Sequence, residues 1–241
     1  MRGFDCDTAV RRRAGAASTY DAELGAGWLD GFGICGGMLV ATLGRALGAE
    51  LDGSDPFAIS AQFLSPARPG PATVHTEALR RGHGLSTGSA SLMQRDSDGT
   101  PVERVRALAA YGDLDSLDDL DKRTLTACPD LLPPEHCRGT APTYGRLDLR
   151  LDPRPCDGRV KGWLRLSDGQ PPDALTLLLA ADSLPSRDGA VVELTSYVHA
   201  RPAPGWLRLS RVSSGASSDA EVWDSRDRLV AQSRRLISST V

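Results

Sequence analysis

The feature that most constrains the fold is an internal repeat, in which an apolar helix is followed by four strands. In the first half of the chain, residues 34–50 carry apolar side chains at helical spacing. Four strand-like stretches follow this predicted helix, at residues 57–64, 72–82, 85–96 and 101–112. A turn rich in aspartate and glycine at 96–99 joins the last two strands as a hairpin. The first half therefore predicts one helix and an antiparallel meander.

The second half shows the same order of elements. Strands are predicted at 146–152 and 160–168, a helix over 171–184, and further strands at 191–200, 206–215, 217–224 and 228–238. The break Ala67-Arg68-Pro69 has its counterpart in Ala200-Arg201-Pro202. These correspondences indicate a tandem duplication. Ahead of the first copy, residues 1–20 are polar and arginine-rich, which fits a first strand or a loose arm, and residues 20–29 have weak strand character.

A long apolar helix wrapped by one curved antiparallel sheet is the plan of the hotdog fold. Two such copies in one chain predict an α+β double hotdog, whose two sheets join edge to edge and so lose two exposed edges. We expect an N-terminal repeat at 1–117, an acidic and proline-rich linker at 118–143, and a C-terminal repeat at 144–241.

Composition narrows the possible functions. The net charge of −3 provides no basic surface of the kind that nucleic acid requires. No apolar run is long enough for a membrane span, and the first residues lack the apolar segment of a signal peptide, so we expect a cytoplasmic protein. The five cysteines include no CxxC pair, which argues against a disulfide framework or a zinc site. Neither a nucleophile elbow nor a phosphate loop is present, and no cofactor is predicted.

The second predicted helix contains an unusual acid. Its sequence, PPDALTLLLAADSLP at 171–185, is opened by prolines, closed by Pro185 and apolar on almost every face, which predicts a buried helix. Asp182 lies near its end. Burying a lone carboxylate is costly, and an acid near a helix C-terminus also opposes the helix dipole. Such a residue favours a chemical role, although Asp182 could instead face water at a frayed end.

Four stretches carry a resemblance to a known family. They are GGMLVATLGRAL at 36–47, FLSPARPGPATVHTEALRRGHGLST at 63–87, LLLAADSLP at 177–185, and VELTSYVHARPAPGWL followed by EVWDSRDRLVAQSRRL. In this order the chain resembles the type II, or TesB-like, acyl-CoA thioesterases over residues 4–237. The resemblance implies hydrolysis of fatty acyl-CoA thioesters. It also implies that the chain associates into a homo-oligomer.

The resemblance also implies a catalytic set of an aspartate, a hydroxyl residue and a glutamine that together hold and polarise a water. Asp182 matches the aspartate. The hydroxyl position falls at about Val191, so Thr195 is the nearest hydroxyl on that strand, and the glutamine position falls at Arg235. The candidate catalytic residues are therefore Asp182, Thr195 and Arg235, and two of them depart from the family pattern.

Chemistry assigns further candidates. Asp182 could act as the base, and the amides of Gly36 and Gly37 at a helix N-terminus could hold the thioester oxygen. These glycines could equally serve tight helix packing. Arg235 could pair with Asp182, bind a ligand carboxylate or phosphate, or point to solvent if the strand parity is shifted.

Weaker candidates complete the set of residues. Ser60 and Gln62 could line the substrate site, or form ordinary sheet surface. His75, His83 and His199 have no partner apparent in the sequence, and Cys35 is more simply a small buried residue at a helix start.

Three functions remain open. The first is hydrolysis of an acyl-CoA or acyl-carrier thioester through Asp182. The second keeps the fold but changes the reaction, as in a dehydratase or cyclase of a polyketide-like intermediate in natural-product biosynthesis. The third is a non-catalytic acyl-binding module. Fold alone does not decide among them.

Overall fold

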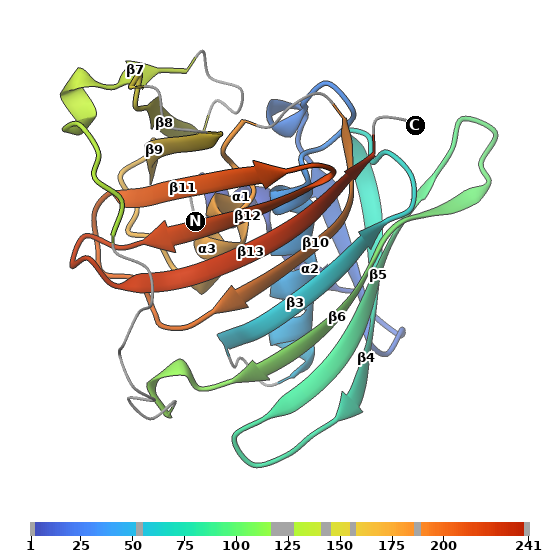
Figure 1. The fold of residues 1–241 in the computed structure, drawn as a ribbon. Helices are drawn as coiled ribbons and strands as arrows, with labels where there is room; N and C mark the ends of the chain where they lie inside the picture. Colours follow the sequence, from blue (N-terminus) through green and yellow to red (C-terminus); the bar gives the residue numbers. More distant parts are fainter. Residues whose placement is uncertain are drawn as a thin grey trace.

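The computed structural model describes residues 3–51, 55–116, 128–140, 146–154, 158–185 and 189–238. One antiparallel sheet curves around two central helices, α2 (Gly36–Glu50) and α3 (Ala174–Ala180) (Figure 1). This is the arrangement that the two repeats predict.

The N-terminal half supplies the first part of the sheet. Its elements are α1 (Phe4–Asp7), β1 (Val10–Arg12), β2 (Thr19–Leu24), η1 (Ala26–Trp28), α2, β3 (Asp55–Phe63), β4 (Gly70–Arg80), β5 (Ser86–Arg95), β6 (Pro101–Gly112) and η2 (Leu114–Ser116). The predicted strands match β3 to β6 within two residues at each end. The arginine-rich start of the chain forms the short helix α1 and the edge strand β1.

The C-terminal half repeats the pattern. Its elements are η3 (Pro134–His136), β7 (Arg138–Gly139), β8 (Leu147–Leu151), β9 (Arg159–Leu166), α3, β10 (Ala190–Val198), β11 (Leu207–Ser214), β12 (Ser217–Trp223) and β13 (Leu229–Ser238). Strand β7 falls within the predicted linker 118–143 and pairs with β8, so this part of the linker extends the sheet. Residues 117–127 and 141–145 of that region lie outside the described residues.

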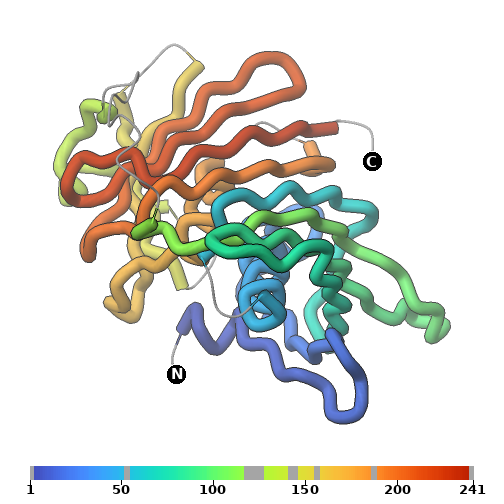
Figure 2. Tube along the Cα trace, turned by 90° about the horizontal axis from the view of Figure 1, so that it is seen from below, coloured from blue at the N-terminus to red at the C-terminus, as the bar shows by residue number. Residues whose placement is uncertain are grey.

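The two halves join through their inner strands. The order across the sheet is β1-β2-β4-β5-β6-β3-β10-β13-β12-β11-β9-β8-β7, so β3 and β10 form the seam. Ser60 lies opposite Thr195 at this seam. Figure 2 shows the blue-green N-terminal strands and the orange-red C-terminal strands meeting there. The predicted edge-to-edge union is therefore present, and it leaves neither inner strand with an unpaired edge.

Helix α2 is buried because its apolar side chains surround it. Met38, Leu43 and Leu47 are fully enclosed, and the helix packs against α3 and strands β3 to β6. Burying each such side chain contributes about 1.5–3 kcal/mol to folding. The helix is consequently fixed in place, and with it the position of its N-terminus.

Helix α3 is shorter than the sequence predicts. It begins only after Asp173, whose carboxylate accepts hydrogen bonds from the backbone and side chain of Thr176 in a capping box. It ends at Ala180, and the amide of Asp182 donates to Leu179 O in the turn that follows. Placing Asp182 within the helix was therefore wrong, because the capping box starts the helix late and a tight turn ends it early.

The described residues contain no helix long and apolar enough to cross a membrane. The same part of the chain holds no group of three or more histidine, cysteine, aspartate or glutamate residues arranged to bind a metal ion.

Candidate functional site

A cavity of about 530 Å³ lies where the start of α2, the turn after α3 and the first residues of β10 come together. Loops 30–34 and 64–67 close its sides. Most of its lining is apolar, including Phe32, Leu39, Phe63, Leu184, Val191 and Val192. Asp30, Asp182 and Arg235 bring charge to this lining. An apolar cavity with few convergent polar groups is the usual form of a small-molecule site.

Asp182 is the buried acid of this cavity. Its side chain is 7% exposed. One carboxylate oxygen, Oδ2, accepts a hydrogen bond of 2.9 Å from the amide of Gly37. The other, Oδ1, accepts one of 2.7 Å from Nη1 of Arg235. The Gly37 amide belongs to the N-terminus of α2, where the backbone N–H groups have no partner within the helix and carry partial positive charge.

Strand parity brings Arg235 to this acid. On β13, Arg235 points toward the helices, whereas its neighbour Arg234 points outward and pairs with Asp219. The Nε of Arg235 donates to Ser218 Oγ at 2.9 Å, and its side chain is 5% exposed. Its remaining nitrogen, Nη2, is buried and has no hydrogen-bond partner within the described chain.

A second arginine, Arg211 of β11, supports the turn that carries Asp182. Its guanidinium is almost fully buried and donates to the backbone oxygens of Ala181, at 3.1 Å, and Leu184. Its Nη2 also lies 3.8 Å from Asp182 Oδ1. Sequence analysis missed this residue, although a signal exists. Leu207, Leu209 and Arg211 lie at every second position of β11 and therefore share one face of the strand. An arginine on a strand face that is otherwise apolar indicates a buried charge.

The two glycines at the start of α2 let the helices approach closely. A Cβ at Gly37 would lie 3.0 Å from Leu179 O and 3.1 Å from Asp182 Cβ, and one at Gly36 would lie 3.0 Å from Asp182 Oδ2. The Gly37 amide already serves Asp182, and Gly36 lines the cavity. The close contacts fit the packing role, and the Gly37 amide serves Asp182 rather than a thioester oxygen.

The other candidate residues lie on the opposite face of the sheet. The Thr195 hydroxyl lies 2.8 Å from Ser60 Oγ and donates to Glu193 Oε1 at 2.5 Å, while the buried Leu194 beside it faces the helices. Gln62 is exposed on the same outer face as Ser60. The structure thus does not bring Thr195, Ser60 or Gln62 to Asp182. Val191 and Val192, near the expected hydroxyl position, line the cavity instead.

The histidines and Cys35 also lie outside this cavity's lining. His199 contacts Gln232 at 3.1 Å on the surface, and His75 contacts Thr19 at 3.3 Å. Cys35 is buried and directly precedes α2.

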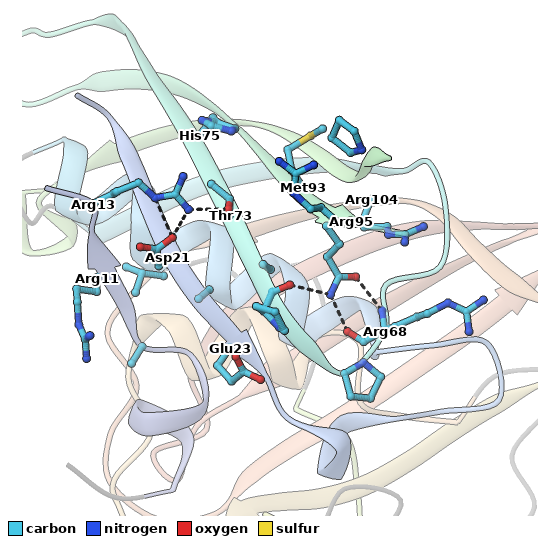
Figure 3. Close-up of a pocket in the computed structure, with 18 of the residues that line it drawn as sticks. Arg11, Arg13, Asp21, Glu23, Arg68, Thr73, His75, Met93, Arg95 and Arg104 are labelled. Atoms are coloured by element: carbon cyan, nitrogen blue, oxygen red, sulfur yellow. Dashed lines mark hydrogen bonds and ion pairs between the residues drawn. The ribbon is translucent and has the colours of Figure 1, made fainter. Parts of the chain in front are cut away.

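A larger groove of about 1030 Å³ runs over β1, β2, β4 and β5 (Figure 3). Its walls carry several arginines. Arg13 pairs with Asp21 and donates to Thr73 Oγ1 at 3.0 Å, and Gln94 donates to Arg68 O at 2.8 Å, which fixes the loop after β3. These contacts tie the surface together. The Asp182 cavity, where a buried carboxylate meets apolar walls, is the stronger candidate for a reaction.

Sequence comparison matches both halves of the chain to described domains. Residues 24–112 match the acyl-CoA thioesterase N-terminal domain, and residues 125–238 match the acyl-CoA thioesterase C-terminal domain. An uncharacterized protein of Mycobacterium tuberculosis is 29% identical over 92% of this chain and 91% of its own length.

Solved structures agree on the fold. A candidate thioesterase II from Thermobifida fusca YX is 29% identical, with a TM-score of 0.86 and coverage of 99% of both chains. A hot dog protein of unknown function from Alicyclobacillus acidocaldarius is 20% identical, with a TM-score of 0.83 over 99% of this chain and 98% of its own. The dehydratase domain of RzxB from Pseudomonas fluorescens is 16% identical, with a TM-score of 0.62 over 94% of this chain and 96% of its own. These likenesses confirm the predicted α+β double hotdog.

Proposed function

Because the chain belongs to the acyl-CoA thioesterase family, we propose that it hydrolyses the thioester of an acyl-CoA or acyl-carrier substrate in the Asp182 cavity. The observation that carries this proposal is a buried carboxylate at the N-terminus of α2, set in an apolar cavity of about 530 Å³. The apolar walls suit an acyl chain, and the carboxylate suits a water that attacks its carbonyl.

Hydrolysis of a thioester requires a nucleophilic water, a base and a group that stabilises the oxyanion. Asp182 orients the water and accepts its proton as the oxygen bonds to the acyl carbon. The N-terminus of α2 at Gly36 stabilises the negative charge that develops on the carbonyl oxygen. The carbon–sulfur bond then breaks, and Asp182 returns the proton to the departing thiolate. The products are a free acid and a free thiol.

The neighbours of Asp182 account for its orientation in this scheme. The Gly37 amide and Arg235 Nη1 each fix one carboxylate oxygen, at 2.9 and 2.7 Å. The hydroxyl and glutamine that the family resemblance implies are replaced by Val191 and Arg235. Placement of the water therefore falls to Asp182 itself, with the guanidinium as its support.

A second candidate keeps the cavity but changes the reaction. The valine and the arginine at the two replaced positions favour a dehydratase or cyclase that acts on a polyketide-like thioester. In that case Asp182 would move a proton on the acyl chain, and the thioester would survive. The identity of the product separates this candidate from hydrolysis.

The test is turnover of a series of thioesters from acetyl-CoA to palmitoyl-CoA, together with dicarboxylic acyl-CoAs. Free thiol is followed with a chromogenic reagent, and products are identified by mass spectrometry. We expect the wild-type protein to release free thiol and the Asp182→Asn variant to release none. Intact thioesters with a modified chain would support the second candidate, and binding without any turnover would identify an acyl-binding module.

A further inference from the structure

Arg235 has one more hydrogen-bonding group than the protein uses. Its Nε donates to Ser218 Oγ at 2.9 Å and its Nη1 donates to Asp182 Oδ1 at 2.7 Å. Its Nη2 is buried and has no partner in the described chain. A buried donor left unpaired is unfavourable, more so on a charged group. Because Arg235 lines the Asp182 cavity, a ligand in that cavity could supply the missing acceptor.

Several side chains that share the cavity with Arg235 offer its Nη2 no acceptor. Val191, Val192 and Leu184 have apolar side chains, and they share the cavity with Arg235. A guanidinium matches a carboxylate better than any other common acceptor, because its parallel N–H groups meet both carboxylate oxygens. The apolar walls also place this acceptor on the acyl group rather than on the charged end of the carrier.

Asp182 keeps support when Arg235 binds a second acid. The Gly37 amide donates to Asp182 Oδ2 at 2.9 Å, and Arg211 Nη2 lies 3.8 Å from Oδ1. One face of the Arg235 guanidinium can thus serve Asp182 while its remaining nitrogen serves the ligand.

We propose that the acyl group of the substrate carries a carboxylate, which Arg235 binds through Nη2. This inference rests on the proposed function, because it describes the acyl end of the same thioester. The spacer between the carboxylate and the thioester is short, since one guanidinium contacts both the ligand carboxylate and the Asp182 that acts on the carbonyl. The substrate class is therefore the thioester of a short dicarboxylic acid.

Binding of two non-hydrolysable thioethers of CoA tests this inference without requiring turnover. The 4-carboxybutyl and pentyl thioethers have the same number of carbons and differ only in the terminal group. Isothermal titration calorimetry should give the carboxybutyl compound an affinity about tenfold higher or more. Equal affinities, tighter binding of the pentyl compound, or binding of neither compound would overturn the inference.

Two variants of β13 assign the preference to one side chain. Arg235→Gln should remove the preference, whereas Arg234→Gln removes the same charge from the outer face and should retain it. Arg235→Lys keeps the charge without the planar fork, so in this variant the preference should shrink but persist. It still tests the assignment if Arg235→Gln fails to fold. A preference unchanged in Arg235→Gln or in Arg235→Lys would contradict the assignment.

Turnover distinguishes the two proposals from each other. Glutaryl-CoA and valeryl-CoA differ in the same way as the thioethers. Equal turnover of both, with equal binding of the analogues, would leave hydrolysis standing and reject the carboxylate. Selective binding of the carboxybutyl compound without turnover of either thioester would retain the carboxylate site and reject hydrolysis.

Discussion

Two buried carboxylates lie at opposite ends of α2, and they differ in what surrounds them. Asp182 faces the N-terminus of the helix, and Glu50 is its last residue. The Glu50 carboxylate accepts hydrogen bonds from Arg12 at 3.2 Å, from Arg81 at 3.1 Å and from the Tyr20 hydroxyl at 3.1 Å. Both acids are thus enclosed and each contacts arginine, so the contacts alone do not separate a structural acid from a chemical one.

The two acids differ in the exposure of the arginines that contact them and in whether they line a cavity. The arginines at Glu50 are about half exposed, at 53% and 48%, and Glu50 lines neither of the two cavities described above. Arg235 is 5% exposed and shares an apolar cavity with Asp182. Glu50 therefore ties the edge of the sheet to α2, whereas Asp182 is held where a ligand can reach it. A position in the lining of an apolar cavity is therefore what distinguishes Asp182 from Glu50 and what supports the proposed catalytic role.

The largest expected effect separates the two acids in catalysis. Asp182→Asn should lower thioester turnover by about 10²–10⁴-fold, because in the proposed reaction it removes the group that accepts the proton from water. Glu50→Gln should leave turnover within a few-fold of the wild type. Circular dichroism confirms that both variants are folded before rates are compared. Similar losses in the two variants would show that the contrast between the acids is false.

A smaller effect concerns the close approach of the helices at the Asp182 end. Gly37→Ala places a Cβ against Leu179 O and should destabilise the fold by about 1–3 kcal/mol in urea unfolding. Gly27→Ala is the matched control, because its added Cβ meets no atom within 4 Å. If the two variants were equally stable, the glycine pair would not be needed for packing.

Substitution of Glu50, at the other end of α2, should change the stability of the protein rather than its rate of turnover. Glu50→Gln removes the charge that Arg12 and Arg81 contact, and we expect a loss of about 1–2 kcal/mol in the free energy of unfolding. The exposure of both arginines keeps this loss small. Added salt should reduce the difference from the wild type, because exposed ion pairs are screened. A loss that salt does not change would indicate a different origin.

The smallest effect is a pH dependence at the same end. Burial and the hydrogen bond to Glu50 raise the pKa of Tyr20 above its usual value of 10.0. The folded protein thus holds this proton more tightly than the unfolded chain. The resulting stability is present below about pH 10 and is lost as pH rises through the folded-state pKa. The stability gap between wild type and Tyr20→Phe should therefore shrink above pH 10, and a gap that widens there would contradict this.

The architecture could be predicted from the sequence because both repeats show the same order of helix and strands. Helical spacing and alternating strands set the elements to within a few residues, and β6 agrees at both ends. The length of α3 could not be read from apolar character alone, since the capping box at Asp173 and the turn at Asp182 decide it. Local hydrogen bonds, rather than hydrophobicity, determine where such a short helix begins and ends.

The candidate site was predictable only in part. Asp182 could be singled out from the sequence, because burying a lone carboxylate in an apolar stretch is unfavourable. Thr195 was chosen for its hydroxyl, but the buried Leu194 and Ser196 on either side place it on the outer face. Arg211 became a neighbour of Asp182 through the pairing of β11 within the sheet, which no local pattern reports. Residue types in the sequence suggest candidates for a site, whereas the register of the sheet determines which of these side chains lie close together.

The most direct measurement is a crystal structure of the protein with the pentyl or 4-carboxybutyl thioether of CoA. The account predicts that the alkyl chain fills the cavity lined by Leu39, Phe63 and Val191, with the carbon beside sulfur next to Asp182. It would be contradicted by an analogue that lies in the arginine-lined groove over β1, β2 and β4, or on the outer face near Thr195, while the Asp182 cavity stays unoccupied.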